Sequence, residues 1–337
     1  MRRVRAESPE ARLGGVSPRA RTRVLVAAAA AVSAAVVVGI TVLQAEDGGA
    51  GEPGATLPAP PLELGLLARD DPETRALREA ESLLDDGERS SARQRFEEIL
   101  ADDPGSVEAA VGQAIAAWPD GTVERLSRLV DENPESGVAR LHLGLALLAS
   151  GDAEAAASQW RETTRRDPDS PAALRAEDLL HPEMAPGRPP FVAPFPELPA
   201  LEGLPPDRQL LALERRAEAG GAADWLLLGS AYQRAGRPVS ASHAFARAAE
   251  LEPETLAARV AAAVGRFDKD DPSETFSRLG PLARDHPRAG VVRYHLGLGL
   301  SWLGSLEEAK RQLRQARSGF YGREAERLLS RLEAISP

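Results

Sequence analysis

Two of the chain's five histidines stand in nearly identical stretches of sequence. His142 lies in "RLHLGLALLASG" and His295 lies in "RYHLGLGLSWLG". Imidazole is a common metal ligand and the usual acid–base group near neutral pH, so the pair could be a metal site or a repeated acid–base group. The other histidines are not spaced as ligands: His181, His243 and His286. Because the chain also has no cysteine, we predict no metal and no cofactor, and we interpret both histidines as markers of a duplication.

The sequence carries no motif of a known catalytic site. It lacks the Walker loop, HExxH, GxSxG and the dinucleotide fingerprint. The glycine-rich stretch "GGAGEPGA" has no Gly-Lys-Ser/Thr after it, so we interpret it as a spacer and not as a phosphate loop. Paired carboxylates such as Asp85–Asp86 and Asp270–Asp271 fall at predicted helix ends, where they usually cap. We predict that the protein is not an enzyme, and the net charge of −10 argues against nucleic acid as a partner.

Helical periodicity predicts the elements that must position these residues. It runs through residues 69–180 and again through residues 206–335, and a proline-rich connector at 181–205 interrupts it. Aromatic residues make up only 4% of the chain, so alanine and leucine supply most of the apolar surface, which favours helix. We therefore predict an all-α fold after the first 68 residues.

One repeat in the second helical region carries a complete family signature. The order W-x2-L-G-x2-Y, A-x3-F, P is formed by Trp225, Leu228, Gly229, Tyr232, Ala241, Phe245 and Pro253. This pattern resembles the tetratricopeptide repeat (TPR) family, and the layout resembles its membrane-anchored bacterial members. The resemblance implies a solenoid of helical hairpins. Within each hairpin, a glycine such as Gly229 allows the two helices to approach closely.

The two helical regions also match each other. "GVARLHLGL" (137–145) pairs with "GVVRYHLGL" (290–298), and weaker repeats on either side pair in the same order. We interpret this as the duplication of a block of three repeats, which is about the minimum that buries a continuous core. The predicted TPR block 1 spans 69–180 and TPR block 2 spans 206–335, each closed by a final capping helix.

Near the N-terminus, residues 24–43 are twenty residues without a charge. As a helix they would be about 30 Å long, enough to cross a bilayer. Residues 1–23 contain seven arginines, so we predict a single-pass transmembrane helix with an Arg-rich cytoplasmic tail and an extracytoplasmic C-terminal domain. Residues 44–68 are predicted to be a flexible Gly/Ala/Pro spacer. A cleaved signal peptide ending at "LQA" (43–45) is the alternative.

The resemblance also implies a binding surface. In the TPR family the first helices of successive repeats line a groove, and the matching positions here are Leu141, Leu145, Leu148, Leu226, Ser230, Gln233, Arg234, Tyr294, Leu298 and Trp302. The first helices of the third and last repeats are apolar nearly all round, so something must cover them. Neighbouring helices, a hydrophobic partner segment, or the chain's own apolar stretch 189–199 could each do so.

The resemblance implies a function in protein–protein interaction. We expect a membrane-anchored extracytoplasmic scaffold that mediates protein interaction or envelope complex assembly, bound to a protein or peptide partner. The layout resembles that of membrane-anchored TPR proteins of envelope assembly and cytochrome c maturation. A regulatory or peptide-binding module that docks an apolar segment in the groove, and a secreted TPR protein with a cleaved signal, are the alternatives.

Overall fold

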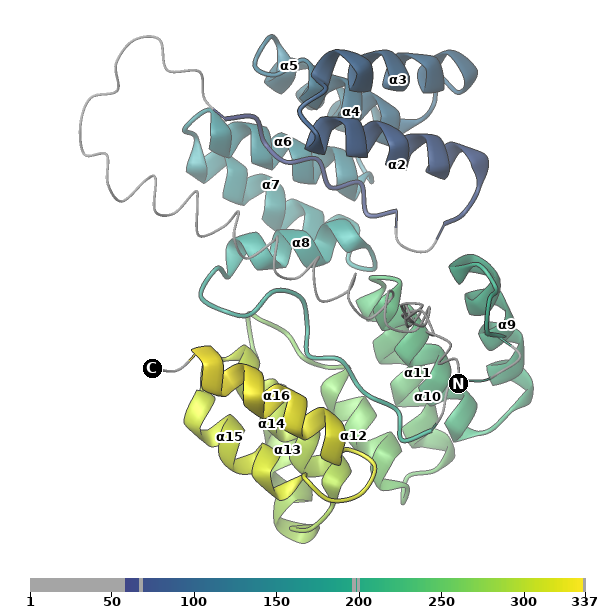
Figure 1. Ribbon diagram of the computed structural model, residues 1–337, viewed down its shortest axis with the longest axis vertical. Coiled ribbons are helices and arrows are strands. Elements are labelled where there is room, and N and C mark those ends of the chain that lie inside the picture. The colour runs from purple at the N-terminus through teal and green to yellow at the C-terminus, as the bar shows by residue number, and fades with distance from the viewer. Residues whose placement is uncertain (1–57, 67–68, 196–197, 199–200, 336–337) are drawn as a thin grey trace, which may run out of the picture. The chain divides into compact units, whose positions relative to one another are not determined.

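The computed structural model (Figure 1) describes residues 58–66, 69–195, 198 and 201–335. The predicted cytoplasmic tail (1–23), the predicted transmembrane helix (24–43) and most of the predicted spacer lie outside these residues. Within them the chain forms fifteen α-helices and no β-strand. None of the described helices is both long enough and apolar enough to span a membrane.

The first seven helices form block 1. They are α2 (Pro72–Asp85), α3 (Arg89–Asp102), α4 (Val107–Ala116), α5 (Thr122–Glu132), α6 (Gly137–Ala149), α7 (Ala153–Arg166) and α8 (Pro171–Leu180). Each helix packs against the next, and the first helices α2, α4, α6 and the closing helix α8 also pack successively on one another. Block 1 is therefore three helical hairpins followed by a capping helix.

Block 2 repeats this arrangement with one helix added at its start. Its helices are α9 (Pro206–Ala219), α10 (Ala222–Arg234), α11 (Pro238–Leu251), α12 (Leu256–Val264), α13 (Ser273–Asp285), α14 (Gly290–Trp302), α15 (Leu306–Gln315) and α16 (Gly322–Ile335). Helices α10 to α16 correspond in order to α2 to α8. Helix α9, which packs on α10, has no counterpart in block 1.

Close contact within the hairpins depends on glycine, as the repeat signature predicts. A β-carbon on Gly229 of α10 would lie 2.3 Å from the ring of Phe245 on α11, and one on Gly144 of α6 would lie 2.3 Å from Trp160 on α7. No real pair of atoms approaches so closely, so these positions admit only a hydrogen. The aromatic ring of the second helix fills the space that the glycine leaves, and Phe245 is completely buried.

Local sequence sets where the helices begin. The hydroxyls of Ser106, Ser136 and Ser170 accept hydrogen bonds from the backbone three residues later, and so cap α4, α6 and α8. The turn within the third hairpin of each block contains a glycine with positive φ, Gly151 (90°) and Gly304 (68°), a conformation that other residues rarely adopt.

The prediction of a flexible spacer through residue 68 is wrong for the part that the structure describes. Residues 58–66, here called strap 1, are extended and packed against block 1 (Figure 1, dark blue). The physical reason is an alternation of apolar residues, since Leu62, Leu64 and Leu66 are each less than 9% exposed. The connector also packs on a block: its residues 189–195, here called strap 2, run along block 2 (Figure 1, teal).

Candidate functional site: two helix faces and their straps

Strap 1 lies on the surface of α2, α6 and α8, here called face 1. Its three leucines share a buried cluster with Leu77 of α2 and Leu143 of α6. Alternate side chains of an extended segment point the same way, so one edge of the strap faces the helices. Strap 1 thus completes the core of block 1.

A histidine fixes the backbone of strap 1. The Glu63 N–H donates to His142 Nε2 at 3.0 Å, and His142 Nδ1 lies 2.7 Å from the Val138 carbonyl. A carbonyl can only accept, so Nδ1 carries the ring's proton and Nε2 is free to accept from the strap. The ring is completely buried, and this burial lowers the pKa of His142 to about 4 although the hydrogen bond to Val138 opposes the shift. His142 is neutral in this arrangement.

Two carboxylates also hold strap 1 on face 1, one from the strap itself and one from α2. The Glu63 side chain pairs with Arg175 of α8 at 2.8 Å, and Glu81 of α2 accepts a hydrogen bond from the Leu64 N–H at 3.1 Å. Desolvation raises the pKa of both carboxyl groups, and Arg175 partly offsets this rise for Glu63. The strap is therefore held by helices α2, α6 and α8 at once.

Strap 2 lies on the equivalent surface of block 2, here called face 2, which α10, α14 and Tyr321 before α16 provide. Phe191 is its anchor, and the ring is 3% exposed. It stacks on the imidazole of His295 with centroids 4.9 Å apart and meets Phe245 edge-on at 5.3 Å. The Phe191 N–H donates to Gln233 Oε1 at 3.0 Å.

His295 holds strap 2 as His142 holds strap 1. The Val192 N–H donates to His295 Nε2 at 2.9 Å, while Nδ1 lies 2.6 Å from the Val291 carbonyl. The Tyr321 hydroxyl donates to the Val192 carbonyl at 2.9 Å, so both backbone groups of Val192 are bonded to side chains. Burial lowers the pKa of His295 to about 4, against the hydrogen bond to Val291.

The connector is fastened again just before strap 2. The Trp302 indole N–H, at the end of α14, lies within hydrogen-bond distance of the carbonyls of Pro186 (3.2 Å) and Gly187 (3.1 Å). Lys269, whose side chain is 1% exposed, donates to Asp178 of α8 at 2.5 Å and to the Ala185 carbonyl at 3.0 Å. A buried cation thus joins α8, the connector and the segment between α12 and α13.

The residues predicted from the family resemblance in block 2 divide into two kinds. Gln233 and Trp302 bond to the connector, while Tyr294 and Leu298 share a cluster with Val192 of strap 2. Leu226 also packs with strap 2, in the cluster that contains Phe191. The remaining two are placed differently: Ser230 donates to the Leu226 carbonyl within α10, and Arg234 is exposed.

In block 1 the predicted residues face another neighbour. Leu141 and Leu145 are buried in a cluster with Trp160 of α7 and Ala176 of α8, and Leu148 packs at its edge. Neighbouring helices therefore cover the apolar α6 there. On α14 the connector does so, and two of the three coverings that the sequence left open therefore occur.

The sequence analysis did not predict that the two histidines bind the straps, although the sequence contains a signal for it. Strap 1 contains "PPLE" (60–63) and strap 2 contains "PPFV" (189–192). In both, two prolines favour an extended backbone, a large apolar residue follows, and the next residue donates its N–H to the histidine. The duplicated unit is thus a strap with its three repeats, and the histidines do structural work in each copy.

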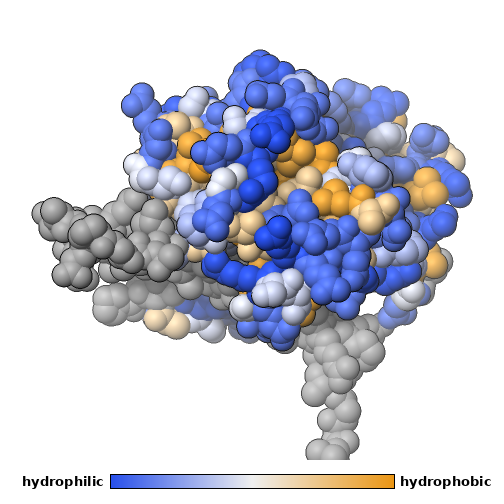
Figure 2. Space-filling view, turned by 90° about the horizontal axis from the view of Figure 1, so that it is seen from above, coloured by the Kyte–Doolittle hydropathy of each residue, from blue (hydrophilic) through white to orange (hydrophobic). Residues whose placement is uncertain are grey.

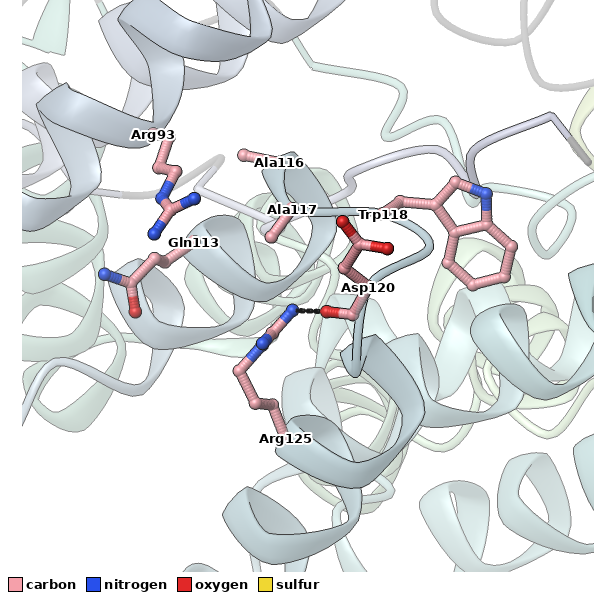
Figure 3. A pocket seen from close by; sticks show the side chains of 7 residues that line it. All are labelled: Arg93, Gln113, Ala116, Ala117, Trp118, Asp120 and Arg125. Atoms are coloured by element: carbon pink, nitrogen blue, oxygen red, sulfur yellow. Dashed lines mark hydrogen bonds between the residues drawn. The ribbon is translucent and has the colours of Figure 1, made fainter. Parts of the chain in front are cut away.

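A separate cavity of about 360 Å³ opens between α3, α4 and α5 (Figure 3). Arg93, Gln113, Asp120 and Arg125 line it. The guanidinium groups are already engaged, because Arg93 donates to Glu97 and Arg125 donates to the Asp120 carbonyl, as the dashed line shows.

Two overlapping stretches of block 1, residues 77–125 and 123–171, match the sequence model of a family described as Tetratricopeptide repeat. No curated protein matches the sequence.

Two solved structures are similar to the chain. The APC/C hetero-tetramer Cut9–Hcn1 is 17% identical with a TM-score of 0.32, and the match covers 77% of this chain and 49% of that one. Yeast Tom70 is 11% identical with a TM-score of 0.29, and the match covers 82% and 67%. This chain therefore spans about half the length of the Cut9–Hcn1 chain. Such TM-scores are too low to support an argument about function.

Proposed function

We propose that the chain, whose block 1 matches the tetratricopeptide repeat model, is an interaction scaffold whose two helix faces bind extended, apolar segments of partner proteins. One observation carries the proposal: each block holds such a segment, strap 1 or strap 2, by the same means. Backbone groups of the strap bond to side chains of the face, and large apolar side chains enter the core. The means of binding a partner segment is thus built into both blocks.

The chemistry of face 2 describes the partner segment that it would take. An extended backbone is recognised by His295, Gln233 and Tyr321, while an aromatic side chain in the place of Phe191 stacks on the imidazole. Backbone hydrogen bonds give affinity with little dependence on sequence, and the aromatic pocket gives specificity. A segment with an aromatic residue after one or two prolines fits best.

The rest of the surface offers few apolar anchors. Figure 2 shows hydrophobic residues in patches between hydrophilic ones on the face seen from above. Among the described residues, four large hydrophobic side chains are exposed by 37% or more: Leu204, Leu211, Leu251 and Phe320. Burial of apolar side chains dominates most protein association. The two faces, once uncovered, are the strongest candidates for it.

The proposal also includes attachment to a membrane. The apolar stretch 24–43 and the seven arginines before it support a scaffold at the outer face of a bacterial-type membrane, where it would assemble envelope complexes. A secreted protein with a cleaved signal is the second candidate. The proposal gives the chain no catalytic role, in keeping with a sequence that contains no catalytic motif.

Photo-crosslinking in cells that express the full chain tests the scaffold. A photoreactive residue at Gln233, on face 2, should crosslink to a partner protein, and Phe191→Ala should increase the yield because it weakens the covering strap. Leu251→Ala, which removes an exposed apolar side chain at the end of α11, is the matched control and should change nothing. The proposal fails if crosslinks arise equally from exposed Arg247, outside face 2, and do not respond to Phe191→Ala.

A further inference from the structure

The two strap contacts share a feature beyond holding the chain: each admits only a neutral imidazole. In both histidines, Nδ1 donates to a carbonyl of the same helix and Nε2 accepts from a strap N–H. Both ring nitrogens therefore form hydrogen bonds, Nδ1 as a donor and Nε2 as an acceptor. A protonated imidazole is a donor at both nitrogens.

Protonation would convert each contact from attraction to repulsion. A proton on His295 Nε2 would point at the N–H of Val192, whose nitrogen is only 2.9 Å away. The hydrogen bond would be lost, and a charge would lie in a site that is completely buried. The imidazole cannot turn to avoid this, because Nδ1 is bound to Val291. His142 stands in the same position toward Glu63.

We propose that straps 1 and 2 are proton-sensitive covers: protonation of His142 and His295 releases each strap and uncovers the helix face beneath it. The release of the straps requires no partner protein. Its use in controlling access for a partner rests on the proposed function. The equivalent construction of the two sites indicates that both straps respond in the same pH range.

The charged and titratable groups around His142 come from three elements. Strap 1 contributes Glu63, α8 contributes Arg175 with Asp178 further off, and α2 contributes Glu81. Burial raises the pKa of Glu63 and Glu81, so the packed state binds these two protons more tightly than the open state does. The two carboxyl groups therefore oppose the release of strap 1 in acid, and His142 drives it.

The surroundings of His295 are simpler. Two tyrosines touch its ring edge-on, Tyr294 on α14 and Tyr321 before α16. Burial raises the pKa of Tyr294 to about 12 and that of Tyr321 further, so both stay neutral in acid. Strap 2 itself has no ionisable side chain, and Arg188 just before it is paired with Glu177 of α8. Release of strap 2 therefore depends on His295 alone.

Hydrogen exchange on the full chain, followed by mass spectrometry between pH 7 and pH 4.5, tests the release. The measured quantity is the protection factor, which removes the intrinsic effect of pH on exchange. Protection in segments 58–66 and 189–195 should fall about tenfold or more, because the open state binds the proton more tightly. Helices α10 to α16 should keep their protection. A strap whose protection stays constant, or falls only together with the helices, overturns the proposal.

Glutamine variants separate the two covers. His295→Gln keeps an oxygen that can accept from Val192 but does not titrate, so strap 2 should stay protected in acid while strap 1 still opens. His142→Gln should give the reverse, and the exposed His243→Gln should leave both responses unchanged. Equal acid opening of strap 2 in wild type and His295→Gln would overturn the proposal.

The wild-type chain offers a second test that needs no variant to fold. Histidine-selective ¹⁵N NMR gives the titration midpoint of each buried imidazole, which should coincide with the midpoint of strap opening. Midpoints that differ by more than a pH unit contradict the proposal. These measurements contain no partner, so a failure to find crosslinked partners would count against the scaffold alone.

Discussion

At the scale of single residues, His142 and His295 show how a repeated side chain can be explained by backbone geometry. Each is the one group on its helix that both accepts from a strap and donates to the turn before it. An apolar residue could fill the same space but would leave a buried strap N–H without a partner. The histidines are therefore structural, and their neutrality makes stability depend on pH.

The sign of that dependence follows from the pKa values. His295 titrates near 6.5 when unfolded and near 4 when folded, so between these values the unfolded chain binds more protons. The stabilisation is present above pH 6.5 and is lost as pH falls toward 4. We expect wild type to lose about 3 kcal/mol more than His295→Gln between pH 7 and 4, by urea unfolding at fixed pH. Parallel stability curves for the two proteins would contradict this.

Around His142 the sign is mixed. Glu63 and Glu81 have raised pKa values in the folded chain, so their share of the stability increases as pH falls, opposite to that of the histidine. His142→Gln should therefore remove an acid sensitivity that these carboxyl groups partly mask in the wild type. The pH dependence of stability is therefore measured best at His295, where no carboxyl group of the strap opposes the effect of the histidine.

Glycine substitutions test the close approach of helices at the same scale. Gly229→Ala places a methyl group against the Phe245 ring, and we expect a loss of about 2 kcal/mol in the free energy of unfolding. Gly290→Ala at the start of α14 is the matched control, because the nearest atom beyond its chain neighbours lies 3.6 Å from the new β-carbon, which is an ordinary contact. It should leave the free energy of unfolding within about 0.5 kcal/mol of the wild type. A similar effect of both substitutions would argue against the packing explanation.

At the scale of elements, the straps act as parts of the blocks rather than as linkers. Strap 1 supplies three leucines to the core of block 1, and strap 2 supplies Phe191 to that of block 2. In block 1 these contacts come from α2, α6 and the closing helix α8. In block 2 they come from α10, α14 and Tyr321, which precedes α16. An extended segment can serve this purpose without a β-sheet, because side chains satisfy its backbone groups.

The fastening of the connector can be measured through Lys269. Lys269→Met removes one partner of a buried ion pair and leaves Asp178 without its cation, so we expect a loss of about 3 kcal/mol in the free energy of unfolding. Arg247→Met is the control, since the Arg247–Glu250 pair is half-exposed and such pairs contribute less than about 1 kcal/mol. Equal losses from the two substitutions would show that burial of the lysine does not matter.

At the scale of the whole molecule, the part of the chain that the structure describes contains two copies of a unit made of a strap, three helical hairpins and a closing helix. The copies are not identical, because α9 stands between strap 2 and the first hairpin of block 2. In block 1 only a few residues separate strap 1 from α2. Each helix face is nevertheless reached from the equivalent side by the same Pro-Pro-apolar segment.

Membrane attachment is a prediction at this scale. The full chain should sediment with membranes and resist alkaline extraction, because residues 24–43 are apolar throughout and long enough to span a bilayer. Immunoblotting of the mature protein gives its size, and N-terminal sequencing gives its first residue. A soluble product that begins at Glu46 would instead support the cleaved signal.

The sequence by itself determined the elements and their order. Periodicity gives the helices, and the signature at Trp225, Gly229 and Phe245 gives the hairpin geometry, because both depend on residues close together along the chain. It also suggested that the connector could cover one of the two apolar first helices, without indicating which. The close helix approach at Gly229 was predicted correctly, because the geometry of a helical hairpin fixes that this residue faces Phe245.

Only the tertiary structure decided what covers each face. Leu62, Leu64 and Leu66 form a short alternating pattern, but the pattern does not indicate which helices they pack against. The neighbouring Glu63 donates its N–H to His142, which lies 79 residues further along the chain. The role of the two histidines depends on which backbone N–H reaches Nε2, and no local pattern contains that information. Contacts distant along the chain are set by packing of whole helices, so the purpose of the duplicated histidine became visible only in the folded molecule.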